Sequence, residues 1–81
     1  MEDSRIKAVV QDVIQKGKHG PYAVASTEGV KGTITFSLTE PVWKEKDWPE
    51  PGHQVVLADL RKKSAGWRAQ EGRFLRPSDE Q

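Results

Sequence analysis

The 81-residue sequence contains no cysteine and only two histidines. Without cysteine there is no disulfide framework, no thiolate metal site and no cysteine nucleophile. Since the chain also shows no convergent carboxylates, we expect neither a metal site nor a cofactor. It has no glycine-rich phosphate loop and no recognisable nucleophile motif, which predicts a protein that is not an enzyme. Asp59, within a strand segment, is expected to pair with a cation such as Arg68 across a hairpin rather than to act as a base.

Long apolar runs are also absent. No stretch approaches the roughly 20 apolar residues that a membrane-spanning helix requires. The first five residues, MEDSR, are acidic and polar, unlike the basic and then apolar start of a signal peptide. We therefore expect no contact with a membrane, a cytoplasmic location and a monomer.

Charged residues, in contrast, are abundant and make up 31% of the chain. The formal net charge is +1, yet the charges are unevenly placed, with acids gathered at both ends and in residues 40–51. Residues 5–39 and 52–77 hold eleven of the thirteen Lys and Arg but four of the twelve acids, a net charge of +7. Such a charge on a small body favours an anionic partner, although scattered charge also serves solubility.

A chain of this length is expected to form one domain, near the lower size limit for a single core. We expect residues 5–77 to form it, with residues 1–4 and 78–81 as disordered tails. The first segment, residues 6–14, fits two structures. Its valines and isoleucines favour a strand with a bulge that shifts the apolar face between Val10 and Val13. The same residues also match helical spacing, so a short helix is the alternative.

The rest of the domain is expected to be β-structure. Residues 22–27, YAVAST, place two small alanines on one side, where a neighbouring strand can approach closely. Residues 31–39 contain the clearest alternation, with Ile34, Phe36 and Leu38 on one face and hydroxyl side chains on the other. Residues 52–69 form a strand, a basic turn and a return strand, which continues to Leu75 with a bulge at Glu71 and Gly72.

Three prolines keep residues 40–51, EPVWKEKDWPEP, from forming a central strand. Trp43 and Trp48 are expected to fold back as lids over one open end of a barrel. The alternative is an exposed surface on which they stack against bases or dock a protein partner.

Five strands with a long connection between the third and the fourth are the layout of an OB-fold, a five-stranded Greek-key barrel. OB-folds that bind nucleic acid use the face of strands 2 and 3 and the loops that join strands 1 to 2 and 4 to 5. In this chain those loops are KGKHGP, residues 16–21, and RKKSAG, residues 61–66, its two most basic turns. Barrel closure is expected to bring them to one rim.

Two motifs resemble the S-one RNA-binding domain of bacterial ribosomal and ribonuclease proteins: EGVKGTITFSL, residues 28–38, and PGHQVVLADL, residues 51–60. Residues 66–69, GWRA, are similar to the end of cold-shock domains. The resemblance covers residues 5–77 and implies RNA binding, with Tyr22 stacking on a base and Lys31 and Arg68 contacting phosphate. The chain departs from S-one domains at Thr35, where they often have histidine, and lacks the aromatic-rich motifs of cold-shock domains.

The sequence therefore predicts a nucleic-acid-binding surface in which cations follow phosphates and aromatic rings accept bases. The expected partner is RNA or single-stranded DNA, and the expected role is that of an RNA chaperone or translation-associated factor. The alternative is a protein–protein interaction module that uses the Trp43 and Trp48 loop. The predicted binding residues are Lys16, Lys18, His19, Tyr22, Lys31, Thr33, Thr35, Arg61, Lys62, Lys63, Trp67 and Arg68.

Overall fold

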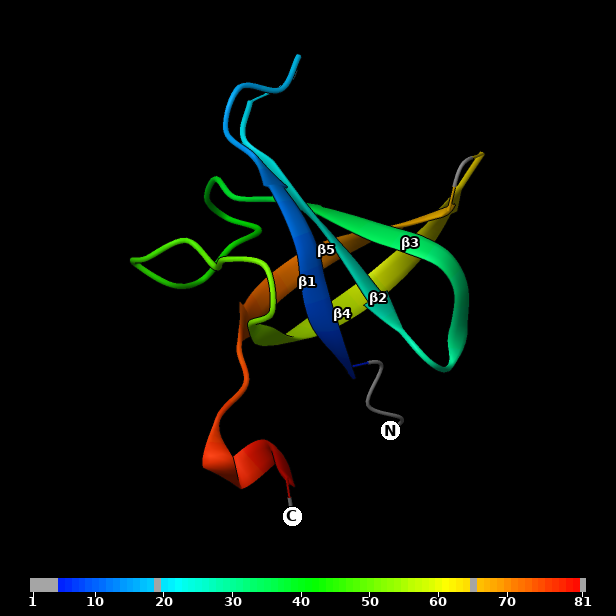
Figure 1. Ribbon diagram of the computed structural model, residues 1–81, viewed down its shortest axis with the longest axis vertical. Helices are drawn as coiled ribbons and strands as arrows, with labels where there is room; N and C mark the ends of the chain where they lie inside the picture. The colour runs from blue at the N-terminus through cyan, green and yellow to red at the C-terminus, as the bar shows by residue number, and fades with distance from the viewer. Residues whose placement is uncertain (1–4, 19, 65, 81) are drawn as a thin grey trace.

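Five strands close into a barrel in the computed structural model, which describes residues 5–18, 20–64 and 66–80 (Figure 1). The order around the barrel is β1-β2-β3-β5-β4. Only β3 and β5 pair in parallel; the other four pairs are antiparallel. The predicted fold class, an all-β OB-fold barrel, is confirmed. The strands are β1 (Ile6–Ile14), β2 (Tyr22–Thr27), β3 (Val30–Ser37), β4 (Gln54–Lys63) and β5 (Gly66–Phe74).

The first segment is a strand, and the helical alternative is wrong. β1 pairs with β2 on one side and with β4 on the other. Its register against β2 shifts between Val10 and Asp12, which is the predicted bulge. Because of that extra residue, both Val10 and Val13 reach the core although they lie three positions apart.

On the inner face of the barrel, small side chains of β2 lie beside large side chains of β3. Ala23 lies opposite Phe36 and Ala25 lies opposite Ile34, and all four are fully buried. The predicted alternation of β3 is confirmed by Leu38, which is also buried. The outward face of β3 consequently carries a row of hydroxyl side chains: Thr33, Thr35 and Ser37.

The inward face of the β4–β5 hairpin changes side at Asp59. Val55 and Leu57 belong to the core, but the next core contact on β4 is Leu60, three residues further on. An ordinary strand repeats its face every second residue, so the backbone must turn over between Leu57 and Leu60. Asp59 performs this turn by adopting a left-handed conformation with φ of 56°.

This change of face inserts no residue into the hairpin. Leu57 lies opposite Gly72, Ala58 opposite Glu71 and Leu60 opposite Ala69, so the register is constant on both sides of Asp59. The bulge predicted at Glu71 and Gly72 is therefore wrong. A left-handed residue on β4 supplies the local twist that a bulge on β5 was expected to supply.

Replacing Asp59 with a β-branched residue should destabilise the barrel. The left-handed conformation costs an ordinary L-residue about 1–2 kcal/mol, whereas Asn and Asp visit it readily. We expect Asp59→Val to lower the free energy of unfolding in urea by about 1–2 kcal/mol relative to Asp59→Asn. Both variants lose the Asp59 carboxylate, so equal stability of the two would contradict this account of the bend.

The connection between β3 and β4 closes the barrel with one of its two tryptophans. Trp43 is 2% exposed; its ring stacks on Phe36 at 5.7 Å between centroids and meets Phe74 edge-on at 5.1 Å. Its indole N–H donates to the carbonyl of Asp47 at 2.7 Å. Trp48 is 43% exposed. The predicted lid is thus confirmed for Trp43 and wrong for Trp48.

The backbone around Trp43 pairs with β5. The Lys44 N–H donates to the Gly72 carbonyl and the Gly72 N–H donates to the Val42 carbonyl, both at 2.9 Å. A Cβ at Gly72 would lie 3.2 Å from the Trp43 ring and 3.0 Å from Leu57. Glycine is therefore the residue that lets this connection lie so close to β5.

The start of β1 and the segment after β5 lie away from the basic loops (Figure 1). A short 3-10 helix, Pro77–Glu80, follows β5 and includes residues 78–80, for which the sequence predicts a tail. Residues 1–4 and Gln81 fall outside the described residues, so the expectation of disordered tails there stays a prediction. In the described part of the chain, no helix has the length and apolar character needed to cross a membrane.

Candidate nucleic-acid interface

The two basic loops lie at the two ends of the outward face of β3. The β1–β2 loop adjoins the last residues of β3, where Tyr22 lies opposite Ser37. The β4–β5 loop adjoins its first half, where Gly66 lies opposite Thr33. Both loops rise from the end of the barrel remote from the start of β1 and from the segment after β5 (Figure 1). Thr33 and Ser37 are four positions apart along β3, about 13 Å at roughly 3.3 Å per residue.

At one end of this face lies a depression of about 520 Å³, here called the Tyr22 depression. It combines two lysines of the β1–β2 loop with side chains of β2, β3 and β5, including five predicted binding residues. The residues that line it are Ile14, Lys16, Gly17, Lys18, Gly20, Pro21, Tyr22, Thr35, Ser37 and Arg68.

The loop backbone holds the Tyr22 ring in place. A Cβ added at Gly17 would lie 2.8 Å from the Cδ1 and Cε1 atoms of Tyr22 and 2.5 Å from the Gly20 carbonyl oxygen. The Gly20 N–H donates to the Gly17 carbonyl at 3.1 Å, and Gly20 has a φ of 100° that favours glycine. The tight turn therefore packs its backbone against the ring, which remains half-buried at the wall of the depression.

At the other end of the face lies a second depression of about 470 Å³, here called the Lys62 depression. Its lining contains three lysines and one tryptophan but no acidic residue. Trp67 lies opposite Lys62 and packs partly against the core, so it anchors the hairpin and still exposes part of its ring. The residues that line it are Gly29, Val30, Lys31, Gly32, Lys62, Lys63, Ser64, Gly66 and Trp67.

The parallel pairing of β3 with β5 joins the two depressions. Thr35 lies opposite Arg68, next to the pairs of Ile34 with Trp67 and Thr33 with Gly66. A Cβ at Gly66 would lie 2.5 Å from the Thr33 carbonyl oxygen, and Gly66 has a φ of 142°. Any other residue at this position would push the two strands apart.

Asp59 pairs with a cation, as predicted, but the partner is on its own strand and is not Arg68 across the hairpin. Asp59 lies 3.4 Å from the Nη2 atom of Arg61 instead. The left-handed backbone at Asp59 directs its carboxylate to the cation two residues further on the same strand. Arg61 is thereby partly neutralised, while Arg68, on the opposite strand, stays available.

Most of the predicted cations have no acid near them. Within residues 5–18, 20–64 and 66–80, no ion pair involves the lysines of the two loops, Lys31 or Arg68. One acid of the β3–β4 connection, Glu45, contacts Arg76 at 3.6 Å and accepts the Phe74 N–H at 3.2 Å. His19, the remaining predicted residue of the first loop, falls outside the described residues.

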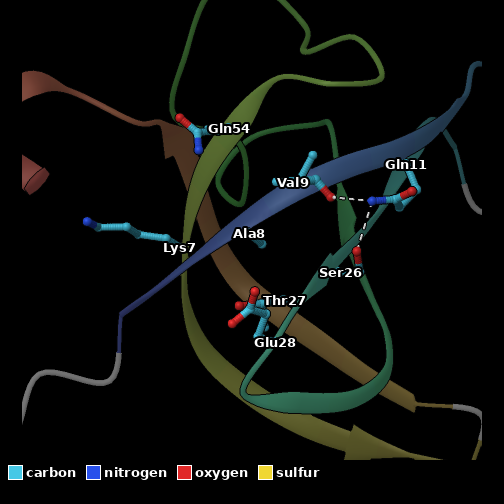
Figure 2. Close-up of a pocket in the computed structure, with 8 residues that line it drawn as sticks. All are labelled: Lys7, Ala8, Val9, Gln11, Ser26, Thr27, Glu28 and Gln54. Carbon is cyan, nitrogen blue, oxygen red and sulfur yellow. Dashed lines mark hydrogen bonds between the residues drawn. The ribbon is translucent and has the colours of Figure 1, made fainter.

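A third depression, of about 510 Å³, extends across β1 between β2 and the start of β4 and includes none of the predicted residues (Figure 2). The Gln11 amide nitrogen donates to the Ser26 hydroxyl at 2.8 Å and to the Val9 carbonyl at 3.4 Å. One lysine, Lys7, and one acid, Glu28, are its charged members, so it offers no net charge to an anion. We therefore place the candidate interface on the β3 face.

The chain matches no protein-family model, and no curated protein or solved structure is significantly similar to it. The closed five-stranded barrel is compatible with an OB-fold. The resemblance to S-one and cold-shock domains is carried by short motifs and stays a prediction.

The structure adds residues that sequence reasoning missed. Ser37 and Pro21 line the Tyr22 depression, where Gly17 allows the loop backbone to pack against the ring. Gly66 lines the Lys62 depression and allows β5 to lie close to Thr33. The only signal in the sequence is the pair of glycines around Lys18, which marks a turn but does not show that one of them lies against an aromatic ring.

Proposed function

We propose that the protein binds single-stranded nucleic acid, and RNA in particular, along the outward face of β3 without catalysing a reaction. The observation that supports this most is that cations without an acid partner lie at both ends of one sheet face that carries hydroxyl side chains. An aromatic ring lies at each end of that face: Tyr22 in one depression and Trp67 in the other. The motif resemblance to S-one and cold-shock domains favours the same function, that of an RNA chaperone or translation-associated factor.

The chemistry of single strands matches this surface. Their phosphates need cations and their exposed bases need flat rings, and a stacked base is worth about 1–3 kcal/mol by alanine substitution. Six described cations without an acid partner surround the face: Lys16, Lys18, Lys31, Lys62, Lys63 and Arg68. With one or two stacked bases, we expect weakly selective binding with dissociation constants on the order of micromolar.

Binding should weaken steeply as salt rises. Each phosphate contact on a single strand lowers log K by about 0.7 per unit of log salt concentration. If three to six cations make contact, the slope should lie between about −2 and −4. Fluorescence anisotropy of a labelled oligouridine, measured from about 50 to 200 mM salt, gives this slope directly. Affinity that does not change with salt would contradict a phosphate-binding face.

A protein partner is the second candidate, and it depends on Trp48 alone. Trp43 is buried against Phe36 and Phe74 and is not available to a partner, whereas Trp48 keeps an exposed ring among the acids of the connection. Under the RNA-binding proposal, Trp48→Ser should bind oligouridine as tightly as the unmodified protein. A lower RNA affinity of this variant would indicate that RNA binds at the β3–β4 connection and not on the β3 face.

A further inference from the structure

The hydroxyl of Thr35 makes a long hydrogen bond to the main chain of β5, which leaves its acceptor lone pairs for a ligand. Thr35 Oγ1 donates its hydrogen to the main-chain carbonyl of Trp67 at 3.4 Å. A threonine hydroxyl has one donor hydrogen and two acceptor lone pairs, so the remaining capacity of this group is to accept. The parallel pairing of Thr35 with Arg68 keeps the Trp67 carbonyl beside β3 and thus holds the hydroxyl in this orientation.

The acceptor at Thr35 differs from the charged side chains around it, which are all hydrogen-bond donors. Lys16, Lys18 and Arg68 line the same depression and are donors, which suits the acceptor oxygens of phosphate. The sugar of DNA has no donor to offer Thr35. The ribose of RNA has one, the 2′-hydroxyl, and this group is what lets a protein distinguish RNA from DNA at a given site.

Thr35 also lies where a ribose is expected. Tyr22 is opposite Ser37 on the neighbouring strand and therefore diagonal to Thr35. Diagonal neighbours in antiparallel strands are about 7–8 Å apart, within reach of an aromatic side chain. A base lying on the Tyr22 ring thus brings its own sugar to Thr35, while Arg68 on the far side of Thr35 can hold the adjoining phosphate.

We infer that Thr35 selects RNA over DNA by accepting a hydrogen bond from the 2′-hydroxyl of the nucleotide whose base lies on Tyr22. This inference rests on the proposed function, because it needs a single strand on the β3 face. It goes further by assigning the discrimination to one side chain and to one proton.

The test compares three probes of equal length and identical bases: oligouridine, oligodeoxyuridine and 2′-fluoro-oligouridine. The fluoro sugar keeps the pucker of ribose but cannot donate. One hydrogen bond corresponds to roughly a three- to tenfold change in affinity, so the unmodified protein should bind oligouridine tighter than both other probes by about that factor. Thr35→Val, which keeps the shape but removes the hydroxyl, should bind all three equally, and Thr35→Ser should keep the preference.

The deoxy probe serves as the internal control, since Thr35→Val should bind it as the unmodified protein does. Equal affinity of the unmodified protein for oligouridine and oligodeoxyuridine would overturn the inference. So would tight binding of the fluoro probe, which would assign the preference to sugar pucker, or a preference that survives in Thr35→Val, which would assign it to another residue. Failure of all three probes to bind would overturn the proposed function itself.

Discussion

The double substitution Lys62→Glu/Lys63→Glu should weaken oligouridine binding by on the order of a hundredfold at about 0.1 M salt. At that concentration each phosphate contact contributes about fivefold in affinity through counterion release. Two contacts are lost, and the two introduced carboxylates repel the strand at the same positions. Both lysines line the Lys62 depression, and neither pairs with an acid among the described residues.

A matched control separates local contact from total charge. Lys7→Glu/Lys46→Glu changes the net charge by the same amount, but Lys7 lines the third depression, across β1, and Lys46 belongs to the connection. Charges more than about 10 Å apart are largely screened at 0.1 M salt, so this variant should bind within about threefold of the unmodified protein. Equal losses in the two double variants would show that only overall charge matters.

Arg61→Glu should have a smaller effect than either change at Lys62 or Lys63, because Asp59 already pairs with Arg61.

Trp43→Ala should unfold the domain or bring it close to unfolding. Removing a buried tryptophan costs about 3–5 kcal/mol, through lost burial and the cavity left behind. A domain of this length is stabilised by only about 4–12 kcal/mol in total. The cost here is expected at the upper end, since the ring contacts both Phe36 and Phe74 and its N–H satisfies the Asp47 carbonyl.

Trp48→Ala is the comparison that makes this result specific. It removes the same side chain five residues away, where 43% of the residue is exposed, and should change the free energy of unfolding by less than about 1 kcal/mol. Urea unfolding followed by circular dichroism measures both variants without relying on the fluorescence of the residues removed. Similar stabilities for the two alanine variants would contradict the closing role of Trp43.

The sequence predicts the barrel well because its strands alternate strongly. The hydroxyl row of β3 and the two small alanines of β2 are local patterns of period two, and they reach the same faces in the structure as in the prediction. The two basic loops are likewise visible in the sequence, and the OB-fold layout is enough to predict that they flank one sheet face.

Features that depend on distant residues were not predictable. The sequence does not distinguish Trp43 from Trp48, because burial is decided by packing against Phe36 and against Phe74, which lies 31 residues beyond Trp43 along the chain. The left-handed conformation of Asp59 follows from the need to turn the inward face of β4. The acceptor character of Thr35 exists only because β5 places the Trp67 carbonyl beside it.

A nuclear magnetic resonance titration with short oligouridine, at low and at high salt, tests the central claim most directly. The titration shows, residue by residue, where the oligouridine contacts the protein. If the oligouridine binds along the β3 face, chemical-shift changes should be confined to residues 16–22, 31–35 and 61–68. These changes should be larger at low salt than at high salt. No change at low salt, or changes confined to residues 42–50 around Trp48, would contradict it.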